Sequence, residues 1–272
     1  EIPLRLVGSE MCIRDSDIID QPGFKKELNE EMLQLYLSLT YVAGENTFFR
    51  GLKKLLPGRY LIWQDGKLEI HRYWKPEFHP DESKTLEDWA DEIHNTLKEI
   101  MPEVKTADER VESFLSGGVD SSYVLAMSDA EQADCCGYEE ERFDESVLAE
   151  KTAQLLGRKF SRSIITPEQF FDIVPYVMYN MEQPLGDASA IVFTLGCNAT
   201  AEHTKICYSG EGSDEFFGGY NMYRNAERYG ENLKNFYVGN TNIMKEDEKQ
   251  KILKKYDPDV LPIELARGIY EE

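Results

Sequence analysis

The sequence is poor in basic residues and has no long apolar run, and each shortage excludes a class of protein. Lys and Arg number 30 against 51 Asp and Glu, which gives a net charge of −21 over 272 residues. Such a chain repels nucleic acid and anionic membranes unless its basic residues are concentrated locally, so we expect neither as a partner. No apolar run reaches the roughly 18 residues that cross a bilayer. The first residues also lack the basic start and apolar core of a secretory signal.

Histidine and cysteine are too few and too scattered for a transition-metal site or a disulfide framework. The four histidines show no zinc-ligand spacing, and the five cysteines are odd in number and include no C-x-x-C. Buried free thiols are therefore expected, as is typical of a reducing compartment. Together with the missing secretory signal, this indicates a cytoplasmic protein.

The chain divides into three parts. Residues 1–16 fit nothing downstream and resemble translated read-through, so we treat them as a non-native leader. Residues 17–78 predict a small mixed piece, because "LNEEMLQLYLSL" has helical spacing and "GRYLIWQDGKLEIHRYW" alternates as two strands around an Asp65-Gly66 turn. A linker rich in Pro, Asp, Glu and Ser follows, and residues 79–272 read as a separate domain.

Strand and helix signals alternate through this second domain. Thr85 and Asp88 predict a capping box, and Thr166 with Gln169 predicts another. Four short strands are expected, with helices between them, at 111–115, 133–138, 159–165 and 205–210. This alternation predicts a Rossmann-like parallel sheet with helices on both faces. A ligand in such a sheet sits beyond the carboxyl ends of the strands.

The string "SGGVDSS" lies at such a strand end. Two glycines let backbone N–H groups approach an anion, and the following helix start and serine hydroxyls add donors. Asp120 would repel phosphate unless Mg²⁺ lay between them. The string therefore predicts a pyrophosphate site, although a Gly-Gly turn whose Ser and Asp cap a helix is the alternative. Neither G-x-x-x-x-G-K-[ST] nor G-x-G-x-x-G is present.

A second glycine-rich string, "SGEGSDE", follows the fourth predicted strand and should face the same cleft. Asp214 would then pair with Asp120 as a magnesium ligand, and Glu211 could accept a proton or organise an attacking amine. The alternative is a solvated acidic loop. In a third string, "EQPLGDASA", Asp187 can cap a helix that starts at Ala188. The charged run Lys245–Lys255 is expected to be a solvated helix face.

These strings carry a resemblance to a known family. "SGGVDSS" resembles the phosphate loop of the N-type ATP pyrophosphatases, while "EQPLGDASA" and "YSGEGSDEFFGGY" resemble the synthetase domain of glutamine-hydrolysing asparagine synthetase. "FFRGLKKLLPGRYLIW" and "HRYW" resemble the last part of its class II glutamine amidotransferase domain. The resemblance implies an adenine nucleotide alpha hydrolase-like domain, truncated, over 79–272, preceded by a remnant of the α+β glutaminase domain over 17–78.

The resemblance also implies the chemistry. Aspartate attacks the α-phosphate of ATP with Mg²⁺ present, pyrophosphate leaves, and ammonia from glutamine converts β-aspartyl-AMP to asparagine and AMP. The full-length protein is expected to be a homodimer. The residues that match nucleotide-binding positions are Leu115, Ser116, Gly117, Gly118, Asp120, Ser121, Ser122, Cys136, Ser209 and Gly210. Glu182, Gly186 and Asp187 match substrate-binding positions. Glu211 matches a catalytic position, and Asp120 and Asp214 match metal-binding positions.

Two departures from the family limit these expectations. The chain begins with Glu1 instead of the nucleophilic cysteine, and the region that supplies a catalytic lysine is missing after Glu272. We therefore expect an incomplete reading frame that alone binds ATP poorly and makes little asparagine. Other readings stay open: a β-lactam synthetase-like or other amidotransferase of the same fold, a tRNA-modifying ATP pyrophosphatase, which the negative charge disfavours, and a non-catalytic interaction fragment, which the retained acidic residues disfavour.

Overall fold

The computed structural model describes residues 15–104, 110–184, 186–221 and 244–260. They fall into two compact units. The first unit takes its described residues from Glu1–Phe78, Met178–Asp187 and Arg224–Glu272, and the second from His79–Val177 and Ala188–Tyr223. Of the predicted leader, residues 1–14 lie outside the described residues, whereas Asp15 and Ser16 begin the short helix α1. The family-based division at residue 78 stays a prediction.

The second unit is built on the predicted parallel sheet. Its strands are β3 (Val111–Phe114), β4 (Gln132–Tyr138), β5 (Lys159–Ile165) and β6 (Ile206–Tyr208). Their order in space is β5-β4-β3-β6, and all three pairings are parallel. The Rossmann-like α/β prediction is confirmed.

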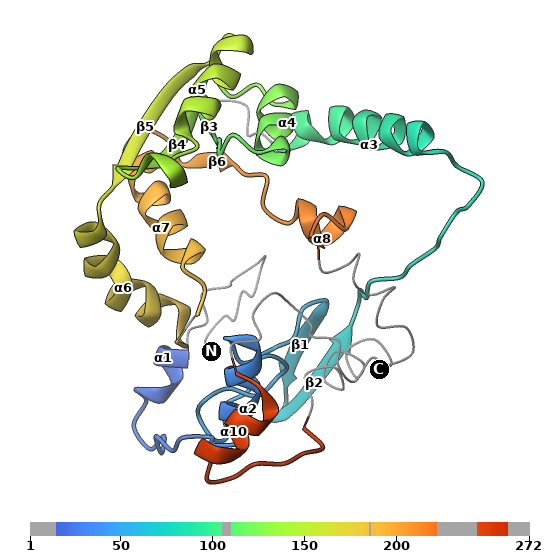
Figure 1. Cartoon of the computed structure of the whole chain (residues 1–272). Helices are drawn as coiled ribbons and strands as arrows, with labels where there is room; N and C mark the ends of the chain where they lie inside the picture. Colours follow the sequence, from blue (N-terminus) through green and yellow to red (C-terminus); the bar gives the residue numbers. More distant parts are fainter. Residues whose placement is uncertain (1–14, 105–109, 185, 222–243, 261–272) are drawn as a thin grey trace. The chain divides into compact units, whose positions relative to one another are not determined.

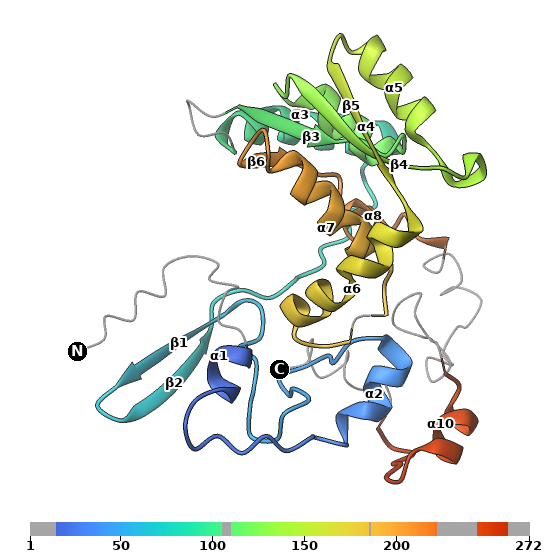
Figure 2. The same cartoon turned by 90° about the vertical axis from the view of Figure 1, so that its left-hand side faces the viewer.

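Helices cover both faces of this sheet. Helices α4 and α5 pack on one face, and α7 packs on the other (Figures 1 and 2). The helical elements of this part of the chain are α3 (Leu86–Ile100), η1 (Met101–Glu103), α4 (Val119–Met127), η2 (Glu141–Phe143), α5 (Ser146–Leu155), α6 (Pro167–Met181), α7 (Ser189–Thr200) and α8 (Ser213–Phe217). Of the helices that the structure describes, none has both the length and the apolar character needed to span a membrane.

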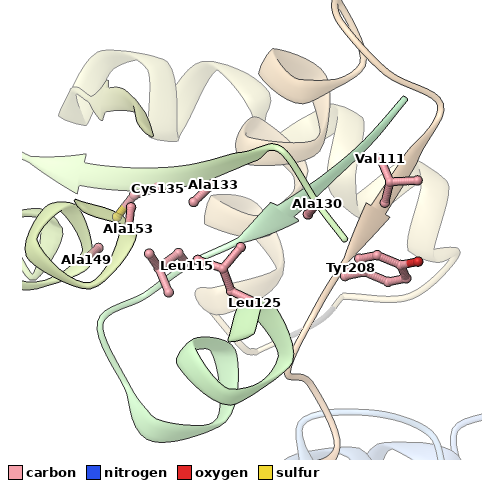
Figure 3. Packing of buried hydrophobic residues seen from close by; sticks show 9 residues of the cluster. All are labelled: Val111, Leu115, Leu125, Ala130, Ala133, Cys135, Ala149, Ala153 and Tyr208. Atoms are coloured by element: carbon pink, nitrogen blue, oxygen red, sulfur yellow. The ribbon is translucent and has the colours of Figure 1, made fainter. Parts of the chain in front are cut away.

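The core between the sheet and helices α4 and α5 is made largely of small side chains (Figure 3). Ala149 and Ala153, one helical turn apart, are both fully buried on α5, and Ala133 and Cys135 face them from β4. Because these side chains are short, α5 lies close to the sheet, and each additional methylene there would have to displace a neighbour.

The local signals at helix starts are confirmed. Thr85 accepts a hydrogen bond from the backbone N–H of Asp88 at 3.2 Å, and the Asp88 carboxylate accepts from the Thr85 N–H at 2.8 Å. Thr166 and Gln169 make the same reciprocal pair at the start of α6. No residue of α3 is fully buried by the part of the chain that the structure describes, although Ile93 and Leu97 are half-buried.

The first unit contains the predicted helix and hairpin. It comprises α1 (Asp15–Ile19), α2 (Met32–Leu39), the antiparallel strands β1 (Arg59–Gln64) and β2 (Lys67–Arg72), and α10 (Glu246–Ile252). Asp65 and Gly66 join the strands with φ values of 52° and 74°, the pair of positive angles that a type I′ hairpin turn requires.

The prediction of a solvated helix face over the charged run is wrong at Lys249. Its side chain is fully buried, and its Nζ donates to Ser38 Oγ of α2 at 2.5 Å and pairs with Glu246. A buried ammonium needs such partners because desolvation of an unpaired charge is costly. The helical repeat places Lys249 on the side of α10 that contacts α2.

A second buried charge, on the α7 face of the sheet, was not anticipated. Glu112 is fully buried in the middle of β3, and its register partners are Gln132 and Cys207. Arg110 Nη2 lies 2.6 Å from its Oε1, yet neither Glu112 oxygen nor Asp134 Oδ2 has a hydrogen bond to any described residue. Burial, together with the neighbouring Asp134, raises the pKa of Glu112 to about 7.

We predict that this carboxyl group makes the protein less stable as the pH rises from about 4.5 to about 7. The folded pKa lies above the ordinary value of 4.5, so the unfolded chain releases this proton first as the pH rises, and its free energy falls relative to that of the folded state. Relative to Glu112→Gln, the wild type should lose up to about 3 kcal/mol between pH 5 and pH 8, measured by urea unfolding.

The exposed Glu131→Gln serves as the control and should follow the wild type at both pH values. A stability difference between wild type and Glu112→Gln that is the same at pH 5 and pH 8 would contradict the prediction.

Candidate functional site: two loops at the ends of β3 and β6

The sheet topology singles out the loops after β3 and β6. Strand β3 is flanked by β4 and β6, because the chain runs from β3 to β4 and β5 on one side and then crosses back to place β6 on the other side of β3. Ligands of open α/β sheets bind beyond the carboxyl ends of the strands at such a switch point. We call Ser116–Ser122, which includes the first turn of α4, the first loop, and Ser209–Glu215, which includes the start of α8, the second loop.

The first loop is held by its own backbone and hydroxyl groups. Gly117 has φ = +83°, a conformation that other residues adopt only with strain, and Gly118 is the N-cap of α4. Ser121 Oγ accepts from Ser116 N–H at 3.1 Å, and Ser122 Oγ donates to the Gly118 carbonyl at 2.6 Å. Both hydroxyls that we expected to contact a phosphate are thus engaged within the loop in this conformation.

The second loop touches the start of α4. A Cβ atom on Gly210 would lie 2.8 Å from Ser121 N and 3.0 Å from Asp120 C. Real Cβ atoms do not approach backbone this closely, so only glycine fits. Within the loop, Ser209 Oγ accepts from Glu211 N–H at 3.1 Å. The structure therefore brings together the two loops that the sequence paired.

The acidic side chains of the two loops differ in their surroundings. Asp120 and Glu211 are exposed, whereas the Asp214 carboxylate lies against Gly219 in its own turn. A hydrogen bond to Glu215 raises the pKa of Tyr220 to about 12.

Among the described residues, no group of three or more His, Cys, Asp or Glu could hold a metal ion. The donors at Asp120 and Asp214 suit Mg²⁺, which normally takes few protein carboxylates and adds phosphate oxygens.

The two predicted strand-end residues lie on opposite faces of the sheet. Leu115 belongs to the core, where it lies close to Leu125 (Figure 3). Cys136 faces α7, where its Sγ lies 3.9 Å from the Val192 carbonyl oxygen and burial raises the pKa of the thiol. Sequence reasoning missed a cavity on this face, lined by Cys136 and by Phe114, Asp134, Ser161, Ser163 and Thr200 among others.

The third predicted loop belongs to the first unit. Its backbone is tied to the end of α2, because Gly186 N–H donates to the Thr40 carbonyl at 3.3 Å and Gln183 accepts from Val42 N–H at 2.8 Å. Glu182, Gly186 and Asp187 are therefore not placed relative to the two loops. The N-cap residue of α7 is Ala188, so Asp187 is not the N-cap that the sequence suggested.

Comparison with known proteins agrees with this architecture. Residues 92–262, well over half of the chain, match the family model described as asparagine synthase. The chain belongs to the asparagine synthase family. Residues 6–74 match the glutamine amidotransferase domain.

The relatives are all longer than this chain. Asparagine synthetase [glutamine-hydrolyzing] 1 of Bacillus subtilis (strain 168) is 28% identical over 288 residues, which cover 90% of this chain and 45% of that protein. A Mycobacterium bovis relative, provisionally named a glutamine-hydrolysing asparagine synthetase, is 30% identical over 76% of this chain and 33% of its own length. "Amidase chry2" of Gibberella zeae is 32% identical over 67% of this chain and 31% of its own. The chain thus spans less than half of each relative.

Solved structures superpose only loosely. A glutamine-dependent NAD+ synthetase from Acinetobacter baumannii, in complex with ADP, has a TM-score of 0.36 at 18% identity and covers 69% of this chain and 39% of that one. An NH3-dependent NAD synthetase from Campylobacter jejuni has a TM-score of 0.35 at 17% identity, and the match covers 66% of this chain and 93% of that one. Such scores add nothing to the fold described above.

We predict that Gly210→Ala destabilises the protein by about 1–3 kcal/mol, because the added methyl group must push α4 away from the second loop. Gly118→Ala is the matched control: its φ is negative, and its Cβ would meet only Ser116 Oγ at 3.3 Å. It should cost less than about 1 kcal/mol in urea unfolding. Equal losses in the two variants would contradict the close contact.

Proposed function

We propose that the two loops bind ATP with Mg²⁺ and that the protein adenylates aspartate and transfers ammonia to it, which forms asparagine. The contact of Gly210 with Asp120 and Ser121 is the observation that supports this most directly, since it puts two glycine-lined backbones at one switch point. Membership of the asparagine synthase family supports the reaction class.

The first loop suits the triphosphate. Gly117 and Gly118 place no Cβ beside the start of α4, and the helix N-terminus favours negative charge, so backbone N–H groups there would bind an anion. Gly118 N–H, which donates to Ser116 Oγ at 3.3 Å, would exchange that hydrogen bond for one to phosphate. Ser209 and Gly210 would bind from the other side. Cys136 would border the nucleotide base, and Leu115 would do so only through its backbone, because its side chain is buried in the core on the opposite face of the sheet. Asp120 and Asp214 would hold Mg²⁺, which when bound neutralises charge on the phosphates.

Catalysis would depend mainly on positioning. The loops hold the α-phosphate where the aspartate β-carboxylate oxygen bonds to phosphorus as the bond to pyrophosphate breaks. Glu211, fixed through its backbone by Ser209, is assigned to orient ammonia and accept its proton as the amide bond forms and AMP leaves. Glu182, Gly186 and Asp187 are proposed to lie on the side of the amino-acid substrate. The amidotransferase match over residues 6–74 supports glutamine as the ammonia source.

A second candidate is amide formation on a different acid. The relative named "Amidase chry2" matches two thirds of the chain at an identity comparable to that of the asparagine synthetases. The two candidates share ATP, Mg²⁺ and both loops, and they differ only in the acid.

The acid can be identified by the exchange of labelled pyrophosphate into ATP. We expect slow exchange with this chain when aspartate is present. The exchange should be slower with glutamate, with carboxyethyl-arginine as a probe for a β-lactam synthetase-like enzyme, and without any acid. Glu211→Gln should retain exchange but lower subsequent amide formation by at least about a hundredfold. Exchange with another acid would favour the second candidate, and the absence of ATP binding would contradict both.

We predict that Asp120→Asn has opposite effects with and without Mg²⁺. With Mg²⁺, loss of a carboxylate ligand should weaken ATP binding about tenfold, or about 1.4 kcal/mol. With EDTA, binding should be unchanged or tighter, because the carboxylate no longer repels phosphate. Isothermal titration calorimetry measures both, and Asp129→Asn, exposed beyond the end of the same helix, is the control. Equal weakening in both conditions would argue against a metal role.

A further inference from the structure

A buried carboxylate organises the connection between β4 and α5. Asp144 Oδ2 accepts from Arg162 Nη2 at 2.7 Å and from Ser146 Oγ at 3.0 Å, and Oδ1 accepts from the backbone N–H groups of Ser146 at 3.2 Å and Tyr138 at 3.4 Å. Its side chain is only 7% exposed. Together these donors, led by Ser146, hold the pKa of Asp144 below its ordinary value.

A glycine makes room for this pair. A Cβ on Gly137 would lie 2.8 Å from Arg162 Nε and 2.9 Å from Asp144 Oδ1, so a larger residue would displace one of the two groups. Arg162 comes from β5 and Gly137 from β4. The ion pair therefore joins the edge strand, across its neighbour, to the start of α5.

The start of α5 in turn borders the first loop. A Cβ on Gly117 would lie 3.3 Å from the Glu145 carbonyl oxygen and from Leu148 Cβ, and 3.4 Å from Ala149 N. Glu145 directly follows Asp144, so the hydrogen bonds of Asp144 fix the backbone that Gly117 packs against. A chain of contacts thus runs from Arg162 to the first loop.

A simple helix cap explains only part of this. The N-cap residue of α5 is Glu145, which makes no side-chain cap hydrogen bond, and Asp144 satisfies Ser146 N–H from one position earlier. A cap needs neither the Tyr138 N–H nor Arg162, which lies 18 residues away in the sequence. These two bonds instead attach α5 to the sheet.

We infer that Asp144 and Arg162 are positioning residues that hold the first turn of α5 against Gly117. They thereby keep the first loop in the conformation that binds a nucleoside triphosphate. The inference rests on the proposed function for its ligand, but its mechanical part concerns the free protein. Neither residue needs to contact the nucleotide.

Hydrogen exchange in the absence of ligand tests the mechanical part. In Asp144→Asn and Arg162→Gln, backbone amides of 116–122 should exchange about tenfold faster, whereas those of β6 should be unchanged. Arg162→Lys should retain most of the protection, because the wild-type arginine donates to Asp144 Oδ2 through a single nitrogen, which a lysine ammonium can replace. Arg142→Gln is the matched control: Arg142 lies in the same connection and pairs with Glu140 at 3.6 Å, both side chains being exposed.

Titration with ATP and Mg²⁺ tests the ligand part. The two disruptive variants should bind ATP about tenfold more weakly, with Arg162→Lys and Arg142→Gln near the wild type. If the wild type does not bind ATP, the proposed function fails. The hydrogen-exchange data still test whether Asp144 and Arg162 hold the first turn of α5 against Gly117. If Asp144→Asn lowers the melting temperature but leaves exchange over 116–122 unchanged, Asp144 is a structural cap and the inference is overturned. Arg162→Lys, the mildest change, keeps the test valid should Asp144→Asn not fold.

Discussion

The candidate site depends on one close backbone contact, between Gly210 and the first turn of α4. That contact requires β6 to pair directly with β3, because only neighbouring strands deliver their following loops to the same point. It also requires the absence of a side chain at Gly210. Given these two conditions, chain connectivity places Asp120, in the first turn of α4, next to the second loop. The positive end of α4 and the acidic second loop then lie together, and in the proposed function they supply donors for phosphate and carboxylates for a cation.

The two faces of the sheet are built on different principles. The face toward α5 is packed with alanine and cysteine, so it is close-packed and contains no charge in its core cluster. The face toward α7 contains Glu112 and Asp134, whose oxygens are incompletely hydrogen-bonded within the described residues, beside a small cavity. Native proteins keep few such groups, because each lowers stability. The rigid face holds the first loop through Gly117, whereas the polar face lies away from that contact.

Local sequence signals predicted most of the fold. The capping pair at Thr85, the Asp65-Gly66 turn and the strand 159–165 all depend on residues close together in the chain, and each is present in the structure. Helix boundaries were predicted less well: within the helical string at residues 28–39, α2 begins only at Met32, four residues after the string starts. The glycine-rich strings were informative because their conformational requirements are specific.

Long-range contacts account for what the sequence did not predict. Glu112 and Ser113 are both polar residues of the short strand β3, and nothing nearby in the sequence indicates that Glu112 will lie beside Asp134. Lys249 is one cation in a charged run, and its partner Ser38 is 211 residues away. Arg162 likewise meets Asp144 only once two strands have paired. Each of these depends on tertiary register, which periodicity within a single element does not encode.

The division of the chain into units has a practical consequence for dissecting the protein. The boundaries after Phe78, Val177, Asp187 and Tyr223 mean that the polypeptide passes from one unit to the other four times. The sheet-bearing unit is therefore discontinuous, because Met178–Asp187, which includes the last turn of α6 and most of the connection to α7, belongs to the other unit. Trimming either terminus cannot isolate it, and a minimal version of this unit would need a redesigned connection in place of Met178–Asp187.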